Sequence, residues 1–199
     1  ACRVEREGAT SIQYIDRQQS GEKIFLRYEQ GVLGDYRVGE REREVIARAD
    51  GAPVICSHAA CRAVNDHPRN LTDDQLGALA DAGGLFGLML HPIAIDHQRR
   101  TLDRVVDHLE HAIDVVGLDR ACLGSDFTTR LSKVLPPMPM PADGLMPEGL
   151  EPGAGIDGLK GPEDYPALLA AMSGRGWSGA DVGAVTRDNL LAFLRRSLP

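Results

Sequence analysis

The sequence lacks three features that would each point to a particular class of protein. Basic residues are not in excess, because 22 Lys and Arg stand against 29 Asp and Glu, giving a formal net charge of −7 and a pI of about 5.3. The arginines are scattered among acidic residues instead of forming a stripe, so no nucleic-acid partner is expected. Apolar runs are broken by Gly, Pro or charge well before the roughly 18 residues that a membrane span needs. We therefore expect a soluble chain with no membrane span and no secretory leader.

Cysteine is also scarce, and its spacing excludes two further classes. The four cysteines, Cys2, Cys56, Cys61 and Cys122, form neither a disulfide framework nor a Cys-x-x-Cys zinc pattern. Cys56 and Cys122 lie inside apolar, strand-like runs and are interpreted as small buried hydrophobic residues. The resulting expectation is a cytoplasmic location, where thiols stay reduced.

The remaining pattern is typical of an α/β protein. With 199 residues, 43% of them hydrophobic, the chain can form one sizeable domain. Short apolar runs predict strands over residues 32–36, 53–57, 85–90 and 121–126, and helical patterns follow the first three of them. Alternation of this kind predicts parallel strands with helices packed outside them.

Two helices carry the clearest local signals. Residues 71–84 have Thr72 as a candidate N-cap, acidic residues in the first turn and glycines at the end. Residues 101–117 place their apolar side chains on one stripe at helical spacing. His108 and His111 border this stripe and are predicted to be solvated or interfacial.

A long irregular segment and two closing helices complete the chain. Residues 131–162 are rich in Pro and Gly, which remove backbone donors and widen backbone freedom, so regular structure is not expected there. A loop of this length is either a lid or binding loop, or a disordered insertion. The closing helices are expected over residues 162–176 and 177–198, the second with Ser178 and Asp181 at the spacing of a capping box.

One predicted strand ends in residues that suit a binding site. The segment "PVICSHAACRAVNDHPRN" begins like a strand buried on both faces, stops at Ser57 and His58, and carries Arg69 into a Pro-marked turn. The carboxyl end of a parallel strand is the edge at which α/β proteins bind ligands. The role of His58 stays open at this point, because a core histidine with both ring nitrogens hydrogen-bonded fits the same position.

Several longer motifs, in order along the chain, carry a family resemblance. They are "PVICSH", "DHPRNLTDDQL", "TLDRVVDHLEHAIDVVGLDRACLGSDF", and "GLKGPEDYPALLAAMSGRGWS" with "DNLLAFLRR". Together they resemble the membrane (renal) dipeptidase family, zinc metallopeptidases of the amidohydrolase-like TIM-barrel group. The similarity leaves residues 1–31 unmatched. It implies a dipeptidase-like half-barrel over residues 32–199, interrupted by the Pro/Gly-rich loop at 131–162.

The resemblance implies a role for one residue in each of three segments. It makes His58 a zinc ligand, Arg69 a substrate-binding residue, and Asp126, in "GSDF", an active-site carboxylate. An imidazole nitrogen is a suitable ligand for zinc, which lowers the pKa of its bound water toward about 7. An aspartate can accept the proton of that water and pass it to the leaving amine, and a guanidinium can hold a carboxylate by charge-assisted hydrogen bonds. We expect the three groups to gather around one divalent ion.

Each of these roles has a simpler alternative. Arg69 could be a surface arginine that pairs with Asp73 or Asp74. Asp126 could form a turn or cap a helix. His91 also follows a predicted strand, but the family usually differs at this position, so a packing role is expected for it.

The sequence departs from the family in ways that leave the metal site incomplete. The family draws its first ligands from a His-x-Asp pair on the first strand and a bridging glutamate from the third, yet no histidine precedes His58. The family's second zinc histidine falls at Arg37, and a cation cannot ligate zinc. A full (β/α)8 barrel needs about 250 residues, so the chain is expected to form about the C-terminal half of a barrel.

The predicted fold class is therefore α/β, a partial (β/α)8 TIM barrel with parallel strands and outer helices. The predicted function is zinc-dependent hydrolysis of the peptide bond of dipeptides through metal-activated water, by a chain that is truncated or has an incomplete metal site. Half a barrel exposes two apolar strand edges, so we expect pairing with a second copy or with a missing N-terminal half. Two alternatives stay open: a noncatalytic remnant that acts as an oligomerising or structural module, and a related amide or lactone hydrolase.

Overall fold

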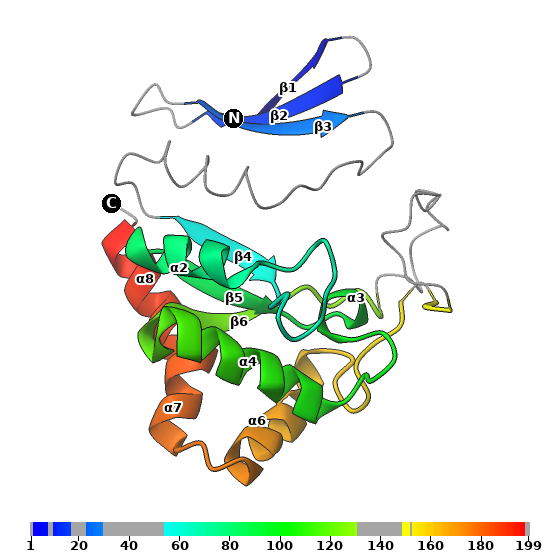
Figure 1. Ribbon diagram of the computed structural model, residues 1–199, viewed down its shortest axis with the longest axis vertical. Coiled ribbons are helices and arrows are strands. Elements are labelled where there is room, and N and C mark those ends of the chain that lie inside the picture. Colours follow the sequence, from blue (N-terminus) through cyan, green and yellow to red (C-terminus); the bar gives the residue numbers. More distant parts are fainter. Residues whose placement is uncertain are drawn as a thin grey trace.

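The computed structural model (Figure 1) describes most of the second half of the molecule in full. Backbone and side chains are described for residues 54–130, 149–151 and 153–197, and the backbone alone for three strands within residues 2–29. The strand predicted at 32–36, the helix that follows it and Arg37 lie outside the described residues, as do positions 131–148 of the long loop.

The N-terminal part of the chain forms an antiparallel sheet that was not predicted from the sequence. Strands β1 (Cys2–Glu7), β2 (Thr10–Asp16) and β3 (Lys23–Glu29) lie in the order β1-β2-β3. Both neighbouring pairs are antiparallel. Antiparallel strands need no crossover helix between them, so this segment is built differently from the α/β part of the chain.

A second sheet is parallel, as predicted. Its strands β4 (Ile55–Ala59), β5 (Leu85–Met89) and β6 (Ala121–Ser125) lie in the order β4-β5-β6, so β5 is central. Helix α2 (Asp73–Asp81) connects β4 to β5, and α3 (Pro92–Ile95) and α4 (Leu102–Val116) connect β5 to β6. The α/β class and three predicted strands are thereby confirmed. β4 continues to Ala59, which places His58 within the strand instead of after it.

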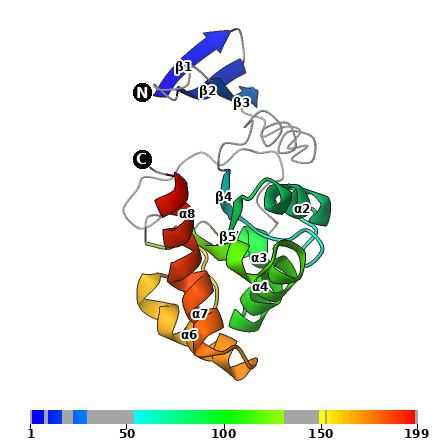
Figure 2. The ribbon, with the colours of Figure 1, turned by 90° about the vertical axis from the view of Figure 1, so that its left-hand side faces the viewer.

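Helices cover both faces of the parallel sheet at its central strand. Residues 55–58 of the edge strand β4 are exposed or half-buried, so the expectations that this strand is buried on both faces and that Cys56 is buried are wrong. Successive side chains of a strand point to opposite faces, and in β5 Phe86 and Leu88 belong to the main core, whereas Leu85 packs with Cys122 and Phe193. Figure 2 shows β4 and β5 between α2 and α4 on one side and α8 (Asn189–Ser197) on the other. All of β5 is buried, as expected for the central strand of a sheet that is covered on both faces.

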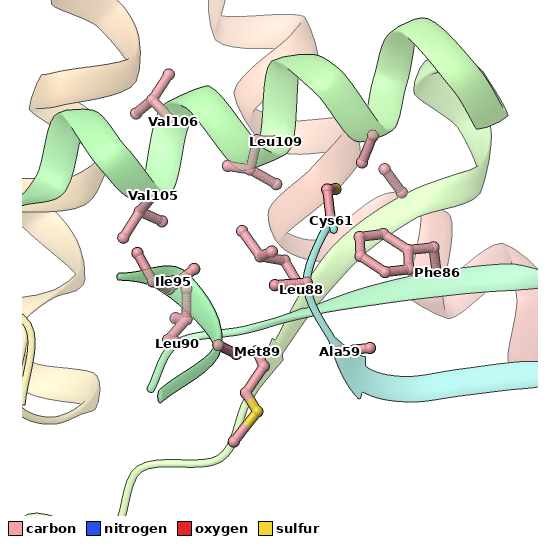
Figure 3. Packing of buried hydrophobic residues seen from close by; sticks show 14 of the residues in the cluster. Ala59, Cys61, Phe86, Leu88, Met89, Leu90, Ile95, Val105, Val106 and Leu109 are labelled. Atoms are coloured by element: carbon pink, nitrogen blue, oxygen red, sulfur yellow. The ribbon is translucent and has the colours of Figure 1, made fainter. Parts of the chain in front are cut away.

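The apolar stripe of α4 fills the main core, as its spacing predicts. Val105, Val106 and Leu109 are fully buried, and Figure 3 shows Leu109 beside Leu88 of the central strand. Full burial of one such side chain stabilises the fold by roughly 1.5–3 kcal/mol. The stripe therefore contributes strongly to holding α4 on the sheet.

His108 was predicted to be solvated or interfacial, and the first of these alternatives is wrong. Its side chain is fully buried on the core side of α4. Nδ1 accepts a hydrogen bond from the backbone N–H of Cys61 at 3.1 Å, and Nε2 donates to the carbonyl of Ile95 at 2.9 Å. His111 is interfacial, as predicted, because its Nε2 lies 2.7 Å from Oδ1 of Asp73 on α2.

Thr72 caps α2, as predicted from its position. The hydroxyl of Thr72 accepts from the N–H of Gln75 at 3.4 Å, and the side chain of Gln75 accepts from the N–H of Thr72 at 2.7 Å. This reciprocal pair is a capping box, which satisfies two backbone donors at the start of the helix.

Replacing Thr72 with alanine is expected to lower the free energy of unfolding by about 1 kcal/mol, because the hydroxyl that caps the N–H of Gln75 is lost and only the backbone carbonyl of residue 72 still accepts from it. Urea unfolding followed by circular dichroism measures the change. Thr72→Ser keeps the hydroxyl and should unfold close to the wild type. Equal losses in the two variants would contradict the capping role.

The two predicted closing helices are confirmed with one change. A short 3₁₀ turn, η2 (Pro162–Asp164), leads into α6 (Tyr165–Gly174). The second helix is α7 (Gly179–Gly183) joined to α8 through a π-helical turn, η3 (Ala184–Asp188), and its predicted capping box of Ser178 and Asp181 is formed. No helix within the described ranges is long and apolar enough to cross a membrane.

Candidate active site

The candidate site lies at the carboxyl edge of the parallel sheet. His58 is next to last in β4, and Asp126 directly follows β6. The arrowheads of β4, β5 and β6 in Figure 1 mark the same edge. Because this is the edge at which parallel sheets bind ligands, the topology brings these residues to the expected place.

His58 is exposed, and its ring is held by the preceding residue. Oγ of Ser57 lies 2.7 Å from Nδ1 of His58. When Nδ1–H donates to this hydroxyl, the lone pair of Nε2 is left for a ligand, which is the usual arrangement for a histidine that binds a metal. The alternative of a core histidine is wrong, because the side chain is not buried.

Arg69 is positioned by a loop with many internal hydrogen bonds. Arg62 donates to the carbonyl of Pro68 at 2.8 Å, and the backbone N–H of Arg69 donates to Nδ1 of His67 at 3.2 Å. The side-chain amides of Asn65 and Asn70 both donate to the carbonyl of Ala94, at 3.0 and 2.7 Å. These two bonds fix the loop to α3.

The guanidinium of Arg69 forms no hydrogen bond or ion pair with the residues that the structure describes. Its Nε is buried without a hydrogen-bond partner, and no described residue forms an ion pair with it. The proposed alternative partner Asp73 pairs with His111 instead. A buried donor without an acceptor costs about 1–3 kcal/mol, so this nitrogen is suited to an acceptor supplied by a ligand.

Asp126 sits on an unusual stretch of backbone. Ser125 and Asp126 have φ values of 59° and 65°, so two successive non-glycine residues adopt the left-handed conformation. Such residues are held in place by their surroundings and cluster at functional sites. Residues 126–130 form no helix, so the alternative that Asp126 caps a helix is wrong, and the turn in this segment lies at residues 129–130.

The strained backbone is supported from two sides. The carbonyl of Ser125 accepts from the N–H of Leu90 at 2.7 Å, and the hydroxyls of Ser125 and Tyr165 are hydrogen-bonded. The rings of Phe127 and Tyr165 meet edge to face, with their centroids 5.7 Å apart. Tyr165, the first residue of α6, therefore buttresses the segment that carries Asp126.

His91 is the residue at this edge that the sequence analysis assigned only to packing. It follows the central strand and caps α3, with Nδ1 accepting from the N–H of Ile93 at 3.2 Å. Its pKa lies below the ordinary value of 6.5, chiefly because burial disfavours the charged ring, while Asp126 raises it and Arg69 lowers it. Both charges thus act on one imidazole. Pro92, a typical first helical residue, was the sequence signal for the cap.

The predicted residues are therefore brought together only in part. The charges of Arg69 and Asp126, which come from different segments, both act on the pKa of His91, and the loop of Arg69 is hydrogen-bonded to the helix that His91 caps. No hydrogen bond or ion pair within the described part of the chain joins His58 to them. Two shallow hollows of about 280 Å³ each, one beside Arg62 and one beside Trp177, are not lined by any of the three predicted residues.

The described residues do not complete a metal site. Within residues 54–130, 149–151 and 153–197, no three His, Cys, Asp or Glu side chains lie close enough together to hold one ion. A catalytic zinc usually takes three protein ligands. His58 fits one such position, and the described residues fit no more than that.

Comparison with known proteins assigns the chain to a family. The model of the membrane dipeptidase family, peptidase family M19, matches residues 29–135. The chain belongs to this family. It is 32% identical over 143 residues to Dipeptidase verJ of Clonostachys rogersoniana, covering 72% of this chain and 31% of that protein. It is 30% identical over 146 residues to Dipeptidase 3 of Homo sapiens, covering 73% of this chain and 25% of that protein.

Two solved structures of metallo peptidases have a similar fold. The dipeptidase AC, described as a metallo peptidase of family M19, matches with a TM-score of 0.62 and 29% identity over 79% of this chain and 41% of that one. A metallo peptidase from Rhodobacter sphaeroides, liganded with a phosphinate mimic of the dipeptide L-Ala-D-Ala, matches in fold with a TM-score of 0.58 at 24% identity, covering 79% of this chain and 46% of that one. This M19 chain thus spans less than half of both structures, and a third or less of the curated relatives above.

Proposed function

We propose that this M19 protein is a zinc-dependent hydrolase that cleaves the peptide bond of dipeptides through metal-activated water, and that the chain forms about the C-terminal half of a (β/α)8 barrel. One observation carries the proposal: at the carboxyl edge of a parallel sheet, in a chain of this family, Asp126 directly follows β6 and the loop that carries Arg69 is hydrogen-bonded to the helix after β5. Names of the relatives support the substrate class, since they are dipeptidases.

Each residue has a chemical task in this proposal. Arg69 holds a substrate carboxylate by charge-assisted hydrogen bonds, which its unpartnered Nε supports. Asp126 accepts a proton and returns it to the leaving amine. His58 supplies one zinc ligand, oriented by Ser57. The other zinc ligands come from outside the described residues.

The source of those ligands is part of the proposal. We propose that a missing N-terminal half or a second copy of this chain supplies them, because the chain covers 31% or less of the length of the curated relatives above. Two buried cysteines of the described region, Cys61 and Cys122, are free thiols. This supports a reducing, cytoplasmic location.

Hydrolysis of dipeptides by the purified chain tests the enzyme proposal. The chain is incubated with zinc and a panel of L,L and L,D dipeptides, and the released amino acids are quantified. Turnover should exceed that of His58→Ala by more than about tenfold, since even partners of metal ligands commonly affect activity by 10–100-fold. His97→Ala, at a half-buried histidine, is the matched control and should keep wild-type turnover. Turnover no higher than that of His58→Ala would contradict catalysis by this chain.

A noncatalytic remnant is the second candidate, favoured by the incomplete metal site of the described residues. Zinc analysis combined with size-exclusion chromatography separates the two functions. An enzyme should carry about one zinc ion or more per chain, and the His58→Ala variant should lose this zinc. A remnant should carry far less than one zinc per chain while still dimerising through its strand edges.

A further inference from the structure

His91 occupies the middle of the candidate site and has no part in the proposed chemistry. It follows the central strand β5, between the ends of β4 and β6. The N–H of Leu90 donates to the carbonyl of Ser125 at 2.7 Å. Since His91 and Asp126 each follow one member of this hydrogen-bonded pair, the two residues leave the sheet side by side.

His91 is also tied to the segment that carries Arg69. The helix that His91 caps, α3, offers the carbonyl of Ala94 to the side-chain amides of Asn65 and Asn70. Asn70 is fully buried and directly follows Arg69. The positions of His91 and Arg69 are therefore fixed relative to each other by the fold.

The ring of His91 keeps one donor for a ligand. Nδ1 is used as an acceptor for the N–H of Ile93, so the neutral imidazole carries its proton on Nε2. No described residue accepts a hydrogen bond from this Nε2–H. Arg69 likewise keeps a buried Nε–H without an acceptor. Two uncommitted donors thus belong to neighbouring segments of one edge, and a buried donor such as the Nε–H of Arg69 is normally satisfied.

We propose that His91 is a substrate-binding residue, which donates its Nε2–H to the same carboxylate that Arg69 holds. This inference deepens the proposed function and rests on it for the substrate class. A carboxylate has two oxygens and several lone pairs, so it can accept from a guanidinium and an imidazole together. The nearby carboxylate of Asp126 repels the substrate carboxylate. Hydrogen bonds from Arg69 and His91 to the substrate carboxylate offset this repulsion.

Binding of a dipeptide without hydrolysis tests the inference. The probes are L-Ala-D-Ala and its C-terminal amide, added to the chain in the presence of a chelator, and the readouts are titration calorimetry and the ring ¹⁵N resonances of histidine. L-Ala-D-Ala should shift the Nε2 resonance of His91, and the amide should not. His91→Asn should weaken binding by about tenfold or more, since one hydrogen bond to a charged group is lost.

The choice of variant separates binding from folding. Asparagine is a favourable N-cap, so His91→Asn keeps the acceptor for the N–H of Ile93 and should keep the melting temperature, while His91→Ala should lower both melting temperature and affinity. His97→Asn, the same substitution beyond the other end of α3, should change neither. An unchanged affinity in His91→Asn, no shift at His91, or equal binding of the amide would each overturn the inference.

The same data distinguish this inference from the proposed function. Binding that depends on His91, in a chain without zinc-dependent turnover, would contradict only the enzyme proposal. Turnover that depends on His58, with unchanged dipeptide affinity in His91→Asn, would contradict only the role of His91.

Discussion

Replacing Gly124 with alanine is expected to lower the free energy of unfolding by about 3 kcal/mol or more, because overpacking of backbone against backbone cannot relax by rotating a side chain. A Cβ at position 124 would lie 2.1 Å from the carbonyl oxygen of Ser57 and 3.0 Å from the carbonyl carbon of Gly87. These atoms belong to β4 and β5, so relief requires the strands to separate. Because His58 lies on one outer strand and Asp126 directly follows the other, the same change should also disturb the site.

The chain offers a matched control at another glycine. Nothing lies within 4 Å of a Cβ built at Gly77, inside α2. Gly77→Ala should therefore stabilise the protein by about 0.5–1 kcal/mol, through helix propensity and a less flexible unfolded chain. Urea unfolding of both variants, followed by circular dichroism, measures the difference. Similar midpoints for Gly124→Ala and Gly77→Ala would contradict the close approach of the strands.

Local patterns were sufficient to predict the α/β part of the fold. The start of α2 depends on Thr72 and Gln75, which are near neighbours in sequence, and the stripe of α4 depends on spacing alone. The N-terminal sheet was not predicted, although residues 11–14, Ser-Ile-Gln-Tyr, alternate polar and apolar side chains with the period of a strand. The family resemblance does not cover this segment, so it offered no help in predicting these strands.

The candidate site was predictable only where a motif marked it. Arg69 and Asp126 came from the family resemblance, and the structure gives physical reasons for their suitability in the unpartnered Nε and the left-handed backbone. A packing role was predicted for His91, and the charges that act on it, those of Arg69 and Asp126, come from residues distant in sequence. The periodicity of one segment predicts its local structure, but it does not predict which other segments that segment contacts in the fold.

His108 illustrates the same limit in the core. It lies three residues after Val105 and four before Ala112, which places it on the buried face of α4. The prediction that His108 is solvated or interfacial followed from the polarity of histidine and not from this position. Its two partners, the N–H of Cys61 and the carbonyl of Ile95, lie in other segments, so only the fold shows that both ring nitrogens are satisfied.

Burial of His108 is expected to make stability depend on pH. Burial, together with Arg104 and His111, lowers the pKa of His108 from 6.5 to about 4, against the opposing effects of the Ile95 carbonyl and Asp107. Between these pH values the unfolded chain binds a proton that the folded chain does not, so stability falls as pH decreases.

Between pH 7 and pH 4, His108 alone is expected to reduce the free energy of unfolding by roughly 3 kcal/mol. His108→Gln keeps a donor and an acceptor but cannot titrate, so its stability should be lower than wild type at pH 7 and should change less on acidification. His97→Gln, the same substitution at a half-buried histidine, should keep the pH dependence of the wild type. Urea midpoints measured at pH 7, 6, 5 and 4 compare the three proteins. Parallel pH profiles for wild type and His108→Gln would show that protonation of this buried ring does not oppose folding, and that the hydrogen bonds from Cys61 and to Ile95 do not depend on its neutral form.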